Sequence, residues 1–375
     1  MKTKSSQAER VIRDLFALAG IDINGSRPWD IRVNDDRTYA RILRAPELTF
    51  GESYMDGWWD CEALDECMHK IMLANLEEKV ADNWKMLFRI LQSRLFNMQS
   101  SSRAFEVGER HYDLGNDLYR AMLDTRLNYT CAYWKNAATL DEAQEVKLDL
   151  VCKKINIRRD MRILELGCGW GSFAKYAAEK YGAHITGVTV SKEQVALGME
   201  LCKGLPVELR LQDYREVSGQ YDAVISIGIM EHVGYKNYRT YMEVASRCLK
   251  DGGIAFIHTI GRNVSATRIN AWMDKYIFPH SMIPTIGQIA KAMEGIFVIE
   301  DIHNFGPDYD RTLLAWYHNF EKAWPLLKSK YGERFFRMWR FYLLSCAGSF
   351  RSRTNQLWHF VMTKPGTPQP ECRFS

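Results

Sequence analysis

The stretch LELGCGWGSFAKY, residues 164–176, decides the fold of this chain. It places three glycines within five positions, between a short apolar run and a segment whose apolar residues have helical spacing. A strand, a glycine-rich turn and a helix in this order let the backbone approach a bound ligand closely. The first question is therefore which ligand this loop binds.

Apolar strands and amphipathic helices alternate along the chain from this loop onward. The pattern predicts helices over residues 172–181 and 191–201, the second with Ser191 as its N-cap. Such alternation predicts a doubly wound α/β domain, with a parallel sheet and helices on both faces. Ligands bind beyond the carboxyl ends of such strands, and the glycine loop follows the first of them. The predicted strands cover residues 161–166, 184–190, 207–213, 221–228 and 252–261.

The loop sequence GCGWG, residues 167–171, differs from the G-x-G-x-x-G of dinucleotide-binding proteins. The second strand ends in GVTVS, without the carboxylate that those proteins use for the ribose. No lysine follows the glycines, which excludes a P-loop. Residues 212–214, Gln-Asp-Tyr, follow the third strand, where an acid and an aromatic ring can contact an adenine. A nucleoside cofactor without a pyrophosphate fits best, and S-adenosylmethionine is the common one; a nicotinamide enzyme is the alternative.

Composition excludes several other classes of protein. Fifty Lys and Arg against 46 Asp and Glu give a net charge of +4, which is too weak to indicate nucleic-acid binding. The nine cysteines lack paired metal-site spacing and indicate reduced thiols, with no metal site. The start of the chain lacks the apolar core of a signal peptide, and no apolar run approaches the roughly 20 residues of a spanning helix. We expect a cytoplasmic protein that at most binds a membrane surface.

The N-terminal part has a different pattern. Residues 8–20 predict an amphipathic helix, and residues 83–104 carry basic side chains but no acidic one. This second stretch is either a helix docked on its neighbours with a solvated basic face, or an interfacial helix on anionic phospholipid headgroups. The run NMQSSSR, residues 97–103, is the best linker candidate. We therefore predict a smaller, mainly helical lipid-surface domain over residues 1–100 and a catalytic domain over residues 101–375.

Motifs spread along the chain resemble one family. From about residue 8 to residue 360 the chain is similar to cyclopropane-fatty-acyl-phospholipid synthases, and over residues 105–360 to mycolic acid cyclopropane synthases. The resemblance rests on GESYMDGWW, HYDLGNDLY, YTCAYW, LELGCGWG, GVTVSKEQ, MEHVG, HTIG, KYIFP, HNFGPDYDRTLLAW and CAGSFR.

The resemblance implies a class I S-adenosylmethionine-dependent methyltransferase, with a Rossmann-like catalytic domain. Such an enzyme transfers the sulfonium methyl carbon to the cis double bond of an unsaturated phospholipid acyl chain. A carbocation forms, and loss of a proton closes the cyclopropane ring. The resemblance also implies a homodimer, which the open edges of a doubly wound sheet favour, peripheral on the inner face of the cell membrane.

The residues themselves nominate two acid–base groups. Glu231 lies in MEHVG just beyond the fourth strand, and His258 lies at the end of the fifth. The alternatives are a helix N-terminal carboxylate and a core histidine. The resemblance implies that both, with Cys131, the backbone at Ile260 and the phenol of Tyr309, hold a bicarbonate ion that accepts the proton. A phenol, an imidazole and backbone N–H groups can donate to such an anion.

The predicted cofactor contacts come from three loops. The glycines would admit the methionine part and the ribose, and Gln194 would replace the missing acid as a donor. The resemblance adds the loop at residue 129 and the pair that flanks the base. The predicted contacts are Tyr129, Thr130, Gly167, Cys168, Gly169, Thr189, Val190, Ser191, Lys192, Glu193, Gln194, Tyr214 and Arg215.

Three possibilities stay open beside these assignments. Cys346, in SCAGSFR, is the family's earlier candidate nucleophile. Because the alkene itself attacks the methyl group, we favour the interpretation that Cys346 packs near the acyl channel. A related lipid methyltransferase would leave a methyl branch or a methylene group instead of a ring. An inactive lipid-surface module is a third possibility, against which the intact glycine loop, Glu231, His258 and Tyr309 argue.

Overall fold

The computed structural model of the chain describes residues 6–76 and 115–374. The predicted domain boundary near residue 100 and the basic stretch over residues 83–104 lie outside the described residues. The expectation that this stretch is a helix is therefore neither confirmed nor contradicted.

The chain divides into two compact units. The first comprises the chain up to Met122 with Asn270–Pro279 and Leu313–Thr354, and the second comprises Leu123–Ile269, His280–Thr312 and Asn355–Ser375. The first unit therefore combines N-terminal and C-terminal segments, which a single cut of the sequence does not describe.

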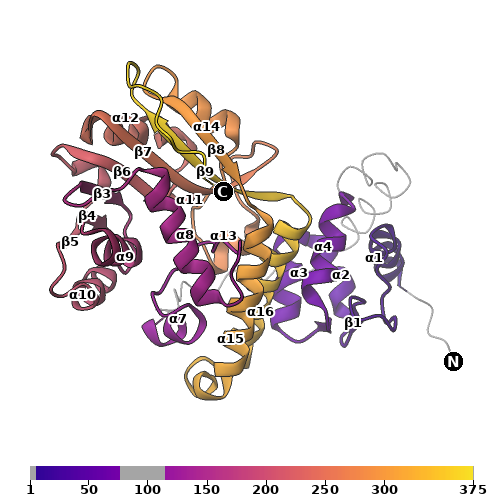
Figure 1. The fold of residues 1–375 in the computed structure, drawn as a ribbon. Helices are drawn as coiled ribbons and strands as arrows, with labels where there is room; N and C mark the ends of the chain where they lie inside the picture. The colour runs from indigo at the N-terminus through magenta and orange to yellow at the C-terminus, as the bar shows by residue number, and fades with distance from the viewer. Residues whose placement is uncertain (1–5, 77–114, 375) are drawn as a thin grey trace. The chain divides into compact units, whose positions relative to one another are not determined.

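The second unit is built on a seven-stranded sheet in the order β5-β4-β3-β6-β7-β9-β8 (Figure 1). Strands β3 to β7 pair in parallel, and β9 runs antiparallel between β7 and β8. The predicted strands and the doubly wound α/β fold are confirmed, whereas β8 and β9 were not predicted. The strands are β3 (Arg162–Leu166), β4 (His184–Thr189), β5 (Val207–Leu211), β6 (Tyr221–Ile227), β7 (Leu249–Arg262), β8 (Val298–Asn304) and β9 (Asn355–Thr363).

Helices cover both faces of this sheet (Figure 1). Successive side chains of a strand alternate between the faces, so Ile163 packs in the core under α8 and α9, and Leu164 in the core under α12 and α14. Ser191 caps α10 as predicted, because its Oγ accepts the N–H of Gln194 at 3.3 Å. The helices are α8 (Leu140–Lys154), α9 (Ser172–Tyr181), α10 (Lys192–Leu201), η1 (Tyr214–Glu216), α11 (Met230–Val233), η2 (Tyr235–Asn237), α12 (Tyr238–Cys248) and α14 (Ile286–Met293).

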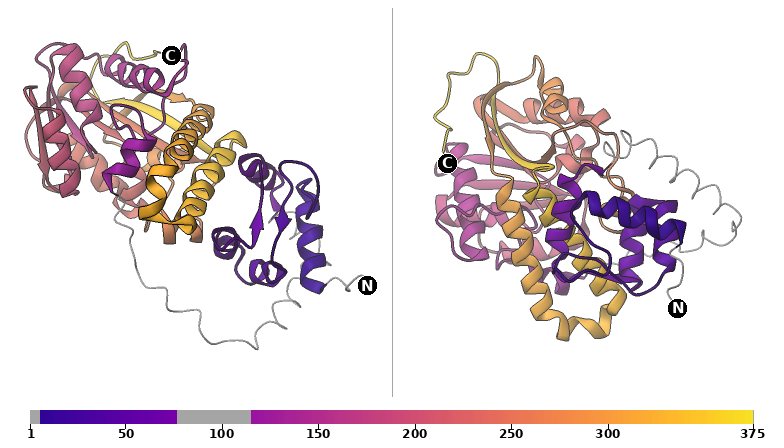
Figure 2. Two further views of the ribbon diagram at one scale, coloured as in Figure 1. Left: turned by 90° about the horizontal axis from the view of Figure 1, so that it is seen from below. Right: turned by 90° about the vertical axis from the view of Figure 1, so that its right-hand side faces the viewer.

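The first unit is mainly helical, with one short antiparallel pair, β1 and β2, among α1–α4 (Figure 2). A Cβ on Gly348 would lie 2.7 Å from backbone atoms of Asp65 and His69, so the CAGSFR glycine allows α16 to pack closely on α4. None of the helices in the described part of the chain is long and apolar enough to cross a membrane. The elements are α1 (Gln7–Leu18), β1 (Arg32–Val33), α2 (Arg37–Arg44), α3 (Pro46–Met55), β2 (Trp59–Asp60), α4 (Leu64–Leu73), α7 (Asn116–Met122), α13 (Ala271–Tyr276), α15 (Pro307–Tyr331, in this unit from Leu313) and α16 (Glu333–Arg351).

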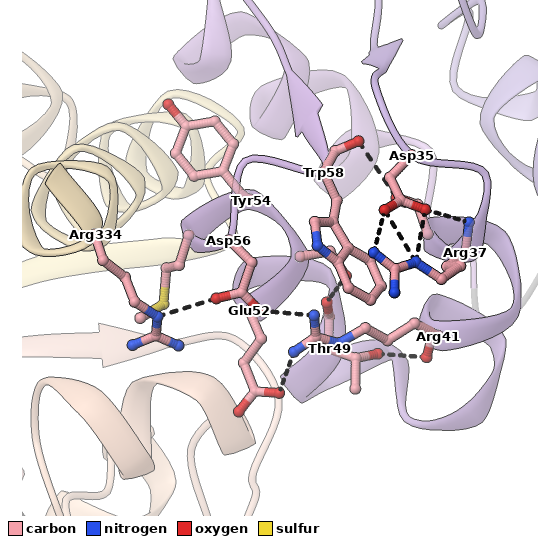
Figure 3. A network of polar contacts seen from close by, with 12 residues as sticks. Asp35, Arg37, Arg41, Thr49, Glu52, Tyr54, Asp56, Trp58 and Arg334 are labelled. Carbon is pink, nitrogen blue, oxygen red and sulfur yellow. Dashed lines mark hydrogen bonds and ion pairs between the residues drawn. The ribbon is translucent and has the colours of Figure 1, made fainter. Parts of the chain in front are cut away.

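A polar network within this unit joins the GESYMDGWW segment to α2 and α16 (Figure 3), and an ion pair with Lys275 joins it to α13. Asp56 pairs with Arg41 of α2 at 2.7 Å and with Arg334 of α16 at 3.0 Å. Glu52 pairs with Arg41 at 3.3 Å and with Lys275 of α13 at 2.8 Å. Two motifs of the family resemblance, GESYMDGWW and KYIFP, thus meet in one network that holds three parts of the chain together.

Candidate active site

A cavity of about 610 Å³ opens at the carboxyl ends of β3, β4, β5 and β6, which we call the glycine-loop cavity. Its lining includes every predicted cofactor residue except Lys192 and Glu193. These two side chains are exposed in the first turn of α10. Because successive helix residues point about 100° apart, Gln194 faces the cavity while Lys192 and Glu193 face solvent. They lie outside the lining of the cavity, and their contact with a cofactor stays a prediction.

The glycine loop forms a wall of backbone. Gly167 and Gly169 have φ of +81° and +53°, a region that side chains other than glycine rarely adopt. The N–H groups of Gly167 and Cys168 both donate to the carbonyl of Val188 at 2.9 Å, which fixes the loop against β4. A Cβ on Gly169 would have no protein atom within 4 Å. Such a Cβ would therefore occupy space that a ligand can use.

Helix α8 positions the second wall, the loop that contains Tyr129 and Thr130. Gln144 donates to the carbonyl of Thr130 at 2.8 Å, and Lys147 donates to the Thr130 hydroxyl at 3.0 Å and to Asn128 Oδ1 at 3.2 Å. Gln144 and Lys147 are three residues apart, so they lie on the same face of the helix. Tyr129 and Thr130 are thereby held at the cavity.

Sequence reasoning missed two buried titratable side chains that line the cavity, Lys147 and Glu165. Lys147 and Glu165 both line the cavity and are 1% and 3% exposed. Glu165 Oε2 has no hydrogen-bond partner among the described residues. Burial raises the pKa of Glu165 and lowers the pKa of Lys147, and the attraction between them opposes both shifts. The available signal was a carboxylate inside RILEL, an otherwise apolar strand.

The far end of the cavity offers polar and aromatic groups. The Thr189 hydroxyl donates to Gln194 Oε1 at 2.7 Å, which leaves the amide NH₂ of Gln194 as a donor. Arg215 is held by Asp213 through two bonds of 2.9 and 2.6 Å. Tyr214, which also lines the cavity, packs between these groups and the core. Gln194, in α10 after β4, and Tyr214 and Arg215, after β5, thus line one end of the cavity, and their contact with a cofactor stays a prediction.

The predicted acid–base residues lie beside β7, next to the cavity but not in its lining. Glu231 Oε1 accepts the N–H of Ile260 at 2.6 Å, and its Oε2 has no partner among the described residues. Burial raises the pKa of Glu231 to about 7, although the Ile260 N–H lowers it. His258 Nδ1 lies 2.9 Å from Nε2 of His359, a residue that sequence reasoning missed. We call Glu231, His258, Ile260 and His359 the β7 cluster.

The structure brings Cys131 and Tyr309 into the same unit as the β7 cluster. Both side chains are buried, Tyr309 in the first turn of α15. Thr312, in the next turn of that helix, accepts the N–H of Ala132, which holds the Cys131 loop against α15. Phe305, just before α15, contacts the ring of His258 at 6.2 Å between centroids. The five residues predicted around an anion thus lie in one compact unit, where the Ile260 N–H donates to Glu231, and their roles remain predictions.

Cys346 is the exception among the predicted catalytic residues. It lies on α16 in the first compact unit, whereas the cavity and the β7 cluster belong to the second. Burial raises the pKa of its thiol to about 12. At neutral pH the thiol is protonated, which makes it a poor nucleophile.

Comparison with known proteins agrees with this geometry. Residues 99–360 match the family model described as mycolic acid cyclopropane synthetase. The chain is 48% identical to cyclopropane-fatty-acyl-phospholipid synthase of Escherichia coli (strain K12), over 95% of this chain and 93% of that protein. It is 32% identical to sphingolipid C9-methyltransferase 2 of Gibberella zeae, over 82% and 63% respectively. The crystal structure of mycolic acid cyclopropane synthase CmaA1 with SAH and CTAB matches with a TM-score of 0.64 and 27% identity, over 68% of this chain and 96% of that chain.

Proposed function

This chain belongs to the mycolic acid cyclopropane synthetase family, and we propose that it converts the cis double bond of unsaturated phospholipid acyl chains into a cyclopropane ring. Membership confirms the family resemblance and the methyltransferase fold that the sequence indicated. The observation that carries the proposal is the 48% identity to a phospholipid synthase over 95% of the chain. That identity extends well beyond the part of the chain that lines the glycine-loop cavity.

The glycine-loop cavity fits S-adenosylmethionine, which supplies an electrophilic methyl group when bound. Gly167 and Gly169 would admit its amino-acid part and ribose, because no Cβ fills the space beside the Gly169 backbone. Glu165 Oε2, which has no hydrogen-bond partner among the residues that the structure describes, would accept a hydrogen bond from the ammonium group. The amide of Gln194 would donate to a ribose hydroxyl, which replaces the carboxylate that other nucleotide sites use.

The β7 cluster supports the proton transfer that the reaction requires. An alkene that takes up a methyl group becomes a carbocation, and the ring closes only when a proton leaves. With its pKa raised to about 7, Glu231 exchanges a proton readily near neutral pH. We further propose that Glu231, His258, Ile260, Cys131 and Tyr309 hold a bicarbonate ion. When bound, that ion would supply a small base within a buried site.

The substrate determines where the protein must act. Because the double bond lies inside a bilayer, we propose a cytoplasmic protein that binds the inner face of the cell membrane and draws the lipid from its surface. The acid-free basic stretch over residues 83–104 supports attraction to anionic lipid. We also propose a homodimer, since the edge strand β8 exposes the apolar side chains of Val298, Ile299 and Ile302.

One assay tests the reaction. The protein is incubated with S-adenosylmethionine labelled in its methyl group and vesicles of an unsaturated phospholipid, and the lipid product is analysed by mass spectrometry. We expect a labelled lipid that has gained CH₂ and resists hydrogenation, as a ring does. A product that hydrogenation reduces would indicate a methylene group instead. That outcome favours the related methyltransferase activity for which the relative from Gibberella zeae is named.

A second assay tests the bicarbonate. Turnover should fall in buffer rigorously depleted of bicarbonate and recover when the ion is added back. A rate that does not depend on bicarbonate would contradict this part of the proposal and assign proton acceptance to Glu231 itself.

A further inference from the structure

Three histidines form one row across the antiparallel part of the sheet. In the strand registers, His258 of β7 lies opposite His359 of β9, and His359 lies opposite His303 of β8. Residues directly opposite in antiparallel strands point to the same face of a sheet. The row therefore runs from β7 through β9 to the edge strand β8, with His359 in its middle.

The ring of His359 is held in one orientation. The residue is 0% exposed and packs edge-on against Phe256 and Phe305, with ring centroids 4.8 and 4.6 Å away. Its Nε2 lies 2.9 Å from Nδ1 of His258. Its Nδ1 is buried and has no hydrogen-bond partner among the described residues. The Nε2 of His359 thus contacts His258, and its Nδ1 has no hydrogen-bond partner among the described residues.

The direction of the bond between the rings follows from this asymmetry. Burial lowers the pKa of both His258 and His359 well below the ordinary value, so each neutral ring carries one N–H. If His258 donated, the proton of His359 would sit on Nδ1 as a buried donor without an acceptor. If His359 donates, its Nδ1 is a bare acceptor. Buried donors without an acceptor are rarer in proteins than buried acceptors without a donor, because the lost hydrogen bond is not replaced by water.

We propose that His359 is a positioning residue for His258: its Nε2–H donates to Nδ1 of His258 and holds that ring with its proton on Nε2. His258 then presents a hydrogen-bond donor to the reacting region. Such a donor can bind an anion or an oxygen, whereas it cannot take the proton that ring closure releases. The inference rests on the proposed function, in which His258 faces the reacting groups. It assigns proton acceptance to Glu231 or to an ion that Glu231 holds.

Two substitutions of His359 separate positioning from packing. The amide nitrogen of glutamine stands where imidazole Nε2 stands, and that of asparagine stands near Nδ1. We expect His359→Gln to keep kcat within about threefold of the wild type. His359→Asn should lower kcat about 10- to 100-fold, as loss of an orienting partner does at other sites, with KM for S-adenosylmethionine and phospholipid unchanged. His303→Gln is the matched control and should keep kcat within about twofold.

Nitrogen-15 NMR of the labelled histidines reads the tautomer directly on the full chain without substrate. We expect unprotonated Nδ1 and protonated Nε2 for His258 in the wild type and in His359→Gln, and a mixture in His359→Asn. A proton on His258 Nδ1 in the wild type would overturn the inference. Equal losses of kcat in both His359 variants, with thermal melting unchanged, would overturn it too, as would a His303→Gln variant as slow as His359→Asn. A wild type that makes no cyclopropane lipid would contradict the proposed function, yet the spectrum would still decide the tautomer.

Discussion

The glycine-loop cavity and the β7 cluster lie at the same edge of one sheet and are built differently. The cavity is lined by the loops that follow β3, β4, β5 and β6 and by the loop of Tyr129 and Thr130, and the glycine loop contributes backbone with positive φ. The β7 cluster consists of side chains buried against the sheet, with hydrogen bonds to a backbone N–H and to a second imidazole. The first arrangement selects a ligand by shape, and the second moves or orients a proton. Substitutions in the two places should therefore change different quantities.

The largest effect is expected in the cavity. Gly169→Val should abolish binding of S-adenosylmethionine, because the branched side chain would fill the space beside the backbone where no protein atom lies within 4 Å. Isothermal titration calorimetry measures the loss. The fold should survive, since the residue is in a loop.

Gly204→Val is the matched control for backbone strain. Gly204 also has a positive φ, +84°, with no atom within 4 Å of a Cβ, and it does not line the cavity. Its variant should bind the cofactor as the wild type does. Equal loss of binding in both variants would show that strain, and not the cavity, explains the result.

The β7 cluster should show the opposite behaviour. Glu231→Gln should lower kcat about 100- to 10,000-fold, as loss of an acid–base group does, and His258→Ala, which removes a hydrogen-bond donor from the same cluster, should lower it within the same range; the Kd for S-adenosylmethionine should stay within about threefold of the wild type in both. Glu300→Gln is the control, because Glu300 is also a buried carboxylate but lies on the edge strand β8, where it accepts hydrogen bonds from Thr363 and Gln369. A large rise in Kd in the Glu231 variant would mean that the two regions act as one site.

The same comparison explains what the sequence could predict of the site. Glycines and polar residues mark the loops that follow strands in the sequence, so the glycine loop and the residues after β4 were predicted from their position, whereas the loop at Tyr129 and Thr130 came from the family resemblance. The electrostatic influence of Lys147 on Glu165 was not visible, because the two residues belong to different elements that only the fold brings together. His359 was missed for the same reason. The residues around a bicarbonate came from the family resemblance, since nothing in their spacing indicates an anion.

The fold shows a similar limit. Strands β3 to β7 are apolar runs and were predicted, but β8 carries Glu300 and Asp301, which lower its apparent strand propensity. In the structure Asp301 pairs with Lys154 of α8 at 2.5 Å, and Glu300 accepts the hydroxyl of Thr363 at 2.6 Å. These partners, distant in the sequence, compensate for placing the two carboxylates of β8 within the sheet. A single sequence does not show such partners.

A third prediction concerns the pH dependence of the free energy of unfolding, and its expected effect is smaller than the two losses of function above. The pKa of Glu231, about 7 in the folded protein, lies above its ordinary value of 4.5, so the folded state holds this proton more tightly. The stabilisation is complete below about pH 4.5 and is lost as pH rises to 7. Between pH 5 and pH 8 the free energy of unfolding of the wild type should fall by roughly 3 kcal/mol relative to that of Glu231→Gln. Urea denaturation of both proteins at both pH values measures this difference. If the two free energies of unfolding changed equally between these pH values, the pKa of Glu231 would be close to its ordinary value of 4.5.

The smallest effect is expected at Cys346, which belongs to neither region. Its thiol has a pKa of about 12, so at pH 7.5 well under about one molecule in a thousand carries the reactive thiolate. The proposed reaction also needs no protein nucleophile, because the alkene attacks the methyl group. Cys346→Ser should therefore keep kcat within about threefold and leave the Kd for S-adenosylmethionine unchanged. Substitution is a sharper test than a thiol reagent, since a bulky adduct on α16 slows the enzyme by disturbing packing alone. A loss above about 100-fold in a variant that melts normally would place α16 at the reacting atoms, and proton transfer could then no longer be assigned to the β7 cluster by itself.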